Sequence, residues 1–90
     1  MEFEWDEEKR RSNLQKHGVD FVRACQIFAG YTVEFEDNRY NYGEERFVAI
    51  GQTGGQVLTV VYTVRGEVLR LISARKATKD ETRIYYEGDS

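Results

Sequence analysis

Three consecutive segments with the composition of β-strands, joined by glycine-containing turns, limit this chain to a fold built on an antiparallel sheet. The segments cover about residues 45–52, 56–64 and 67–74, and the turns fall at Gly54-Gly55 and Arg65-Gly66. Two-residue turns join neighbouring strands of hairpins, so the three strands are predicted to form a meander. Because the chain contains no proline, glycine marks its turns.

Residues 3–5 are predicted to form a short extended segment, two helices are predicted between it and the meander, and one helix is predicted after the meander. Asp6 is a suitable N-cap for a helix that continues to about His17, where Gly18 ends it. Asp20 can cap a second helix, and Thr78 opens a capping box before a short C-terminal helix. The second helix carries an apolar stripe at helical spacing, formed by Phe21, Ala24, Cys25 and Phe28.

Residues 31–36 alternate apolar and polar side chains, which predicts one more strand with a single wet face, and residues 37–44 are predicted to be a polar loop. With 90 residues the chain can build one hydrophobic core and not two, so residues 1–90 are predicted to form a single domain. The predicted fold class is α+β. An antiparallel sheet of about four strands packs on two N-terminal helices and is followed by a short C-terminal helix.

The register of the meander assigns its side chains to two faces. With two-residue turns, Gln52 lies opposite Val57 and Val64 opposite Glu67. One face is apolar and suits the stripe of the second helix. This predicted core face consists of Phe47, Ala49, Leu58, Val60, Tyr62, Leu69 and Leu71.

The opposite face is predicted to hold a functional site. Arg46 and Arg70 stand there among small apolar and hydroxyl side chains, with Cα atoms roughly 10–12 Å apart by ideal strand spacings. Arg75 leaves the end of the same strand as Arg70. Guanidinium groups placed in this way can converge on one phosphate. Surface arginines also commonly pair with a nearby glutamate or extend along the surface, so the structural interpretation stays open.

The first predicted helix lacks an apolar stripe, because Leu14 is its only aliphatic residue. Lys9, Asn13 and Lys16 form a polar row at i, i+4 and i+7 that could face a ligand or partner, although a solvated face is the commoner explanation. His17 is the only histidine. Imidazole suits proton transfer near neutral pH, but a histidine at a helix end more often interacts with the helix dipole.

Charge and cysteine content exclude several functional classes. The net charge of −3 argues against sequence-blind adhesion to nucleic acid over the whole surface, yet residues 65–83 hold six bases against three acids. Cys25 is the single cysteine, so neither an intramolecular disulfide nor a cysteine metal cluster can form within one chain, and metal binding by His17 is not expected because no second histidine could help it. With no signal-like or membrane-spanning segment, we expect a cytoplasmic protein.

Four segments in order along the chain carry a further signal. They are Phe3-Glu4-Trp5-Asp6, Asn13-x-x-Lys16-His17-Gly18-Val19, Glu45-Arg46-Phe47 and Arg70-x-Ile72-Ser73-Ala74-Arg75-Lys76-Ala77, with Glu81 and Tyr85 beyond them. Together they resemble the BrnT family of bacterial type II toxins over nearly the whole chain. The acidic balance departs from the basic character of related RNA-cleaving toxins.

The resemblance implies a RelE-like ribonuclease fold and cleavage of RNA without a metal or other cofactor, which inhibits translation. It also implies a cognate antitoxin with a DNA-binding domain (BrnA-like). Operator DNA would then be contacted only through the antitoxin. The resemblance and the arginine-bearing face together give the catalytic candidates Arg46, Arg70, Arg75, Glu81 and His17. The candidate RNA-binding residues are Lys9, Lys16, Arg65 and Lys76.

In the expected mechanism the three arginines bind the scissile phosphate and stabilise the charge that develops as the 2′-hydroxyl attacks. His17, Glu81 or Lys16 could move the protons, and the sequence does not choose among them. The competing hypothesis is a non-catalytic partner-binding module that acts as co-repressor with a DNA-binding antitoxin.

Overall fold

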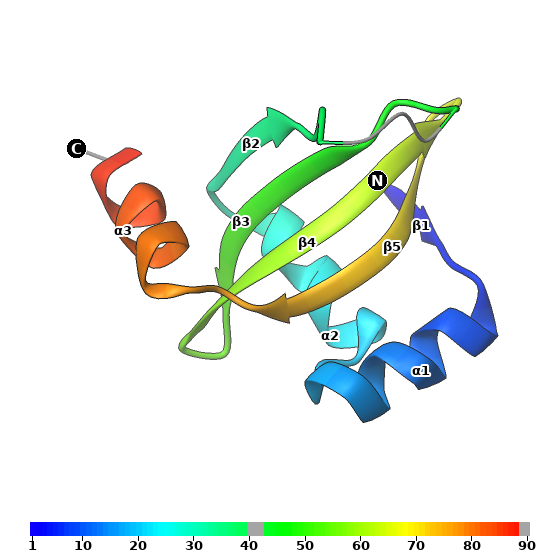
Figure 1. Ribbon diagram of the computed structural model, residues 1–90, viewed down its shortest axis with the longest axis horizontal. Helices are drawn as coiled ribbons and strands as arrows, with labels where there is room; N and C mark the ends of the chain where they lie inside the picture. The colour runs from blue at the N-terminus through cyan, green and yellow to red at the C-terminus, as the bar shows by residue number, and fades with distance from the viewer. Residues whose placement is uncertain (40–42, 89–90) are drawn as a thin grey trace.

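The computed structural model describes residues 1–39 and 43–88, and its central element is a five-stranded mixed sheet (Figure 1). The strand order is β1-β5-β4-β3-β2. β1 runs parallel to β5, and every other neighbouring pair is antiparallel. The strands are β1 (Glu2–Glu4), β2 (Thr32–Glu36), β3 (Phe47–Thr53), β4 (Gln56–Arg65) and β5 (Val68–Lys76).

The prediction of about four antiparallel strands is therefore wrong in one respect. The short N-terminal segment Glu2–Glu4 is a fifth strand, paired from Glu2↔Val68 to Glu4↔Arg70. The extended segment predicted at residues 3–5 therefore belongs to the sheet. Three residues are too few to show a period-2 pattern, so only the pairing with β5 reveals this.

The predicted helix starts are confirmed. α1 (Glu7–His17) begins after Asp6, whose carboxylate accepts bonds from two backbone N–H groups, and it ends at Gly18 in the left-handed conformation (φ 71°). α2 (Phe21–Ala24) follows Asp20 and continues as the 3₁₀ helix η1 (Cys25–Ala29), so the second predicted helix is α-helical only in its first half. α3 (Lys79–Gly88) follows the Thr78 capping box. None of the helices in the described part of the chain could span a membrane.

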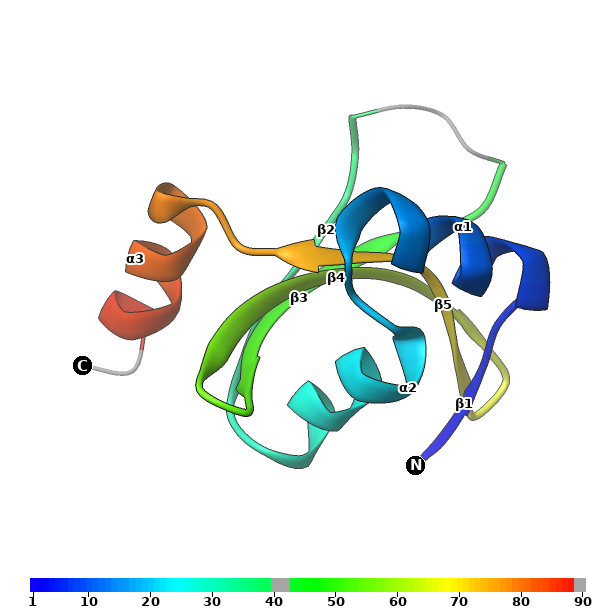
Figure 2. The same ribbon diagram turned by 90° about the horizontal axis from the view of Figure 1, so that it is seen from below.

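Only one of the two N-terminal helical segments packs under the core face of the sheet, which corrects the prediction that both do. α2 and η1 lie on one side of the sheet, whereas α1 lies along the β5 edge and reaches the other side (Figure 2). α1 is almost entirely polar, so it has no stripe to bury against a core.

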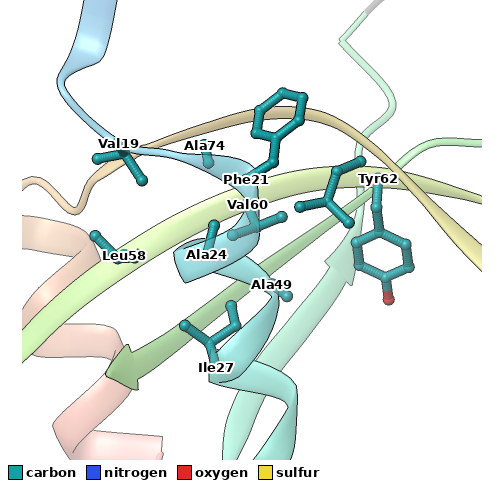
Figure 3. Packing of buried hydrophobic residues seen from close by; sticks show 10 residues of the cluster. Val19, Phe21, Ala24, Ile27, Ala49, Leu58, Val60, Tyr62 and Ala74 are labelled. Carbon is teal, nitrogen blue, oxygen red and sulfur yellow. The ribbon is translucent and has the colours of Figure 1, made fainter. Parts of the chain in front are cut away.

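The predicted core face of the meander is confirmed. Its side chains meet Val19, Phe21, Ala24 and Ile27 in one cluster, in which Phe47 and Leu69 are partly buried (Figure 3). Gly51 permits the close approach of η1, because a Cβ atom there would lie 2.8 Å from Ile27 Cβ.

The register of the second hairpin differs from the prediction. The Gly54-Gly55 turn joins β3 and β4 as expected, with Gln52 opposite Val57. The second turn, however, contains Gly66 and Glu67, so that Arg65 pairs with Val68. This shift by two in the pairing keeps every side chain on its predicted face, since side chains alternate with a period of two.

A β-bulge then changes the faces near the end of β5. Val61 pairs with Ser73 and Tyr62 with Leu71, which leaves Ile72 as an extra residue. Beyond the bulge, Ala74 enters the core and Arg75 pairs with Thr59 on the face of Arg46. Arg75 therefore lies within β5 on the arginine-bearing face and does not leave the strand end as predicted.

The predicted polar loop at residues 37–44 is described only in part, because residues 40–42 lie outside the described residues. On the described side, the Asp37 backbone N–H donates to the Arg46 carbonyl oxygen at 2.7 Å. This bond continues the pairing of β2 and β3 by one step and fixes where the chain leaves the sheet.

Asn13 holds α1 against the edge of β5 that β1 does not cover. Its amide nitrogen donates to the carbonyl oxygens of Ala74 (2.8 Å) and Val19 (2.9 Å), and its amide oxygen accepts from the Ala74 backbone N–H (3.1 Å). The side chain is buried, with 7% of the residue exposed. One amide thus replaces a neighbouring strand for an otherwise unpaired position of β5.

Asn13→Ala is expected to lower the free energy of unfolding by about 2–4 kcal/mol, because it leaves buried backbone groups of Ala74 and Val19 without their partner. Urea denaturation measures the loss. Gln15→Ala, at an exposed position of the same helix, is the matched control and should change stability little. Equal midpoints for the two variants would show that the amide does not anchor α1.

Candidate functional site

The sheet face opposite the core carries two neighbouring hollows. We call this surface the arginine face; it holds Arg46, Val48, Ile50, Thr59, Val61, Thr63, Arg70, Ile72, Ser73 and Arg75. α1 flanks it on one side, and α3 contacts β2 and β3 and covers its Ile50 end. In Figure 2 the chain leaving β2 and the chain entering β3 rise on the side of α1.

The first hollow, here called the basic hollow, is formed between α1 and the arginine face. Its volume is about 280 Å³. Among the described residues that line it there is no Asp or Glu, so positive side chains dominate its surface. Its lining consists of Lys9, Ser12, Asn13, Lys16, His17, Arg46, Ile72 and Ser73.

Three separate structural features bring the lining side chains of the basic hollow together. The polar row of α1 faces the hollow because Asn13, in the middle of that row, is fixed to β5. His17 is the last residue of α1. Arg46 directly precedes β3, and its guanidinium lies 3.7 Å from a carboxylate oxygen of Glu44. Convergent cations with the hydroxyl groups of Ser12 and Ser73 beside them form a surface that can hold a phosphate.

The second hollow, here called the aromatic hollow, lies on the same face next to the first. The two meet where Val61, which lines the aromatic hollow, pairs with Ser73, which lines the basic one. Its volume is about 270 Å³, so the two hollows differ in chemistry and not in size. Its lining consists of Phe35, Glu36, Asp37, Asn38, Arg39, Val48, Thr59, Val61, Arg75 and Glu81.

Arg75 and Glu81 form a two-pronged ion pair in the aromatic hollow, with N···O distances of 2.6 and 2.9 Å. Glu81 also accepts the Thr78 backbone N–H of the α3 capping box. The hydrogen bonds from Arg75 lower the pKa of Glu81 to about 2, and the Thr78 bond acts in the same direction. The same pair raises the pKa of Arg75. Glu81 is thus an ionised carboxylate over the physiological pH range.

The other candidates from the sequence do not line either hollow. Arg70 lies on the arginine face, but its guanidinium pairs with Glu4 of β1 at 2.7 Å. Arg65 and Lys76 are exposed at opposite ends of the sheet, because Arg65 pairs with Val68 at one end and Lys76 with Leu58 at the other. Within residues 1–39 and 43–88, no three His, Cys, Asp or Glu side chains gather as a metal site requires.

The structure therefore divides the predicted site residues. Arg46, His17, Lys9 and Lys16 share the basic hollow, while Arg75 and Glu81 share the aromatic hollow.

Sequence reasoning missed the contribution of the end of β2 and of the residues that follow it. Phe35, Asp37 and Arg39 line the aromatic hollow, and Arg39 forms a two-pronged pair with Asp37 (2.9 and 3.0 Å). The sequence signal was the Asp-x-Arg spacing at the end of the strand, which a polar-loop interpretation leaves unused.

The fold and this site define a small α+β protein whose sheet offers a basic recess beside an aromatic one, on the side opposite its core. The chain belongs to the BrnT family, described as the ribonuclease toxin BrnT of type II toxin-antitoxin systems, whose family model matches residues 5–81. An antitoxin is accordingly the partner that membership of a type II family implies.

A solved structure agrees with this assignment. The chain is similar to the ribonuclease toxin BrnT of Brucella abortus, known from a crystal structure at 1.1 Å resolution, with 33% sequence identity and a TM-score of 0.70. The match covers 88% of this chain and 99% of the Brucella chain. No curated protein matches the chain in sequence.

The Arg75–Glu81 pair predicts a pH-dependent contribution to stability. Because the pKa of Glu81 falls from its ordinary 4.5 to about 2 on folding, the contribution is complete above about pH 5 and is lost as the pH falls toward 2. The difference in free energy of unfolding between the parent and Glu81→Gln should therefore shrink over that range. Glu67→Gln, in the exposed turn, is the control and should differ from the parent equally at each pH. A constant difference for Glu81→Gln would contradict the pairing.

Proposed function

We propose that this protein is a metal-independent endoribonuclease that cleaves RNA at a phosphodiester held in the basic hollow. The observation that carries the proposal is the convergence of Lys9, Lys16, Arg46 and His17 in one recess whose described lining contains no carboxylate. Family membership supports ribonuclease activity. The metal-free chemistry and the site are the proposal.

The cations bind and polarise the scissile phosphate. Arg46 presents a planar set of donors that matches two phosphate oxygens, and Lys9 and Lys16 add positive charge from the facing helix. Negative charge grows on these oxygens as the phosphorus becomes five-coordinate. Donors already fixed by β3 and α1 stabilise that charge without reorganising.

His17 is the proton acceptor in the proposed reaction. Its imidazole removes the proton of the 2′-hydroxyl as that oxygen bonds to phosphorus, and the bond from phosphorus to the 5′-oxygen breaks. Lys16 supplies the proton that the 5′-oxygen takes up. The products are a 2′,3′-cyclic phosphate and a 5′-hydroxyl. Glu81 is poorly suited to this task, since its low pKa makes it a weak base and it lines the other hollow.

Arg75 and Arg70 take different parts in this proposal from Arg46. Arg75 lies in the aromatic hollow, where it can contact RNA beyond the scissile phosphate. Arg70 is held by Glu4 and joins β1 to the arginine face, so we assign it a supporting part in binding. Arg65 and Lys76, outside both hollows, would add only long-range attraction.

The cellular part of the proposal follows from the family. Cleavage of RNA in the cytoplasm would inhibit translation, and an antitoxin carrying a DNA-binding domain (BrnA-like) would neutralise the toxin. The net charge of −3 supports contact with operator DNA only through that antitoxin.

Arg46→Ala is expected to reduce RNA cleavage on the order of 100-fold, measured in the presence of a chelator with protein shown to be folded by circular dichroism. Arg83→Ala, on the exposed face of α3 and outside both hollows, is the matched control and should cleave like the parent. Parental cleavage by Arg46→Ala would place the active site elsewhere. RNA binding by the parent without cleavage would favour the non-catalytic co-repressor.

His17→Ala should lower kcat by roughly 100- to 10,000-fold, because the 2′-hydroxyl loses its proton acceptor, and should leave the affinity for a 2′-O-methyl RNA nearly unchanged. Gln15→Ala in the same helix is the control. End-group analysis of the parental products should find a 2′,3′-cyclic phosphate. A 5′-phosphate product would rule out attack by the 2′-hydroxyl.

A further inference from the structure

Phe35 is an exposed aromatic side chain on the arginine face. It belongs to β2, which forms an edge of the sheet (Figure 1), and its pairing with Val48 places it opposite the core. It is 46% exposed, whereas the neighbouring Val48 is 7% exposed. The ring pairs found within residues 1–39 and 43–88 do not include Phe35. The core therefore gives no reason for an aromatic ring at this position.

The aromatic hollow combines apolar and polar surfaces in a way that the basic hollow does not. Phe35 forms one wall, and Val48 and Val61 are the apolar residues that accompany it. The guanidinium groups of Arg39 and Arg75 lie in the same recess. A planar ring with apolar neighbours and arginines beside it is the surface on which an unpaired nucleobase stacks.

Charge distinguishes the two hollows further. In the aromatic hollow the carboxylates of Asp37 and Glu81 are each engaged by an arginine, and Glu36 adds a third carboxylate, so the described lining carries no excess of positive charge. The described lining of the basic hollow contains two lysines and an arginine and no carboxylate. A phosphate favours the basic hollow, and a neutral, flat group with hydrogen-bonding edges favours the aromatic one.

The sheet register connects the two sites. Phe35, Val48, Val61 and Ser73 form one row across β2, β3, β4 and β5, and the row begins in the aromatic hollow and ends in the basic one. Ideal strand spacings give roughly 14 Å between its ends. One RNA strand can therefore lie across the row with a phosphate at one end and a base at the other.

We propose that the aromatic hollow is a nucleobase subsite in which an unpaired base of the RNA substrate stacks on Phe35, next to the phosphate bound in the basic hollow. The inference rests on the proposed ribonuclease function and adds where a base is held. Stacking of this kind accepts any base, so Phe35 contributes affinity and positions the strand.

The test compares Phe35→Leu, which keeps an apolar side chain but removes the planar ring, with Phe35→Tyr, which keeps the ring. The probes are a 2′-O-methyl oligonucleotide, which cannot undergo 2′-hydroxyl attack, and an abasic oligonucleotide of equal length. We expect Phe35→Leu to bind the base-bearing probe about tenfold more weakly or worse and Phe35→Tyr to bind it like the parent. Both variants should bind the abasic probe like the parent. Val22→Ala, an exposed apolar position on α2, is the matched control.

A second measurement does not depend on cleavage or on the stability of the leucine variant. In Phe35→Trp the new indole should lose fluorescence when the base-bearing probe binds and should keep it with the abasic probe. The parent, whose only tryptophan is Trp5 packed against Phe21, should change little with either probe.

Each outcome decides the proposal. Equal binding of the base-bearing probe by Phe35→Leu and the parent, without quenching in Phe35→Trp, overturns the subsite and leaves cleavage in the basic hollow standing. If the parent binds the base-bearing probe more tightly than Phe35→Leu does but cleaves no RNA, the subsite is supported and the proposed reaction is refuted. Failure of the parent to bind either probe overturns the subsite. The subsite is also overturned if Phe35→Leu binds both probes like the parent but no longer binds the antitoxin.

Discussion

The extra residue in β5 is the constraint on which the arrangement of the site depends. With Ile72 bulged, Ala74 points into the core and Arg75 points to the opposite face. Without the bulge, side-chain alternation would place Arg75 in the core and Ala74 outside, which would bury a charge and open a void. The bulge therefore lets one strand contribute both to the core and to the site.

The edge of the same strand determines where the cations of α1 lie. β1 covers β5 only as far as Arg70, and Asn13 takes over at Ala74. A helix without an apolar stripe gains its position from this buried amide, and its polar row consequently faces Arg46 across the basic hollow. Asn13, which anchors α1, and the lysines that line the basic hollow thus lie on one face of the helix, and a substitution of Asn13 would also move Lys9 and Lys16.

The acidic overall charge is compatible with a site for an anion because charges are sorted locally. Carboxylates line the aromatic hollow and pair with its arginines, whereas the described lining of the basic hollow contains no carboxylate and Arg46 meets Glu44 outside that lining. Field strength in a recess depends on the nearest groups more than on the sum over the surface. The net charge of −3 then limits adhesion elsewhere on the molecule.

The sequence by itself determined the elements whose signals are local. Asp6, Gly18 and the Thr78 capping box end or begin helices through short-range hydrogen bonds, and strand alternation within the meander separated the core face from the arginine face. Only the tertiary structure decided which cations meet. The bulge at Ile72, the fifth strand and the docking of α1 arise from pairing between distant segments. The pattern within one segment does not indicate how stable its pairing with a distant segment is.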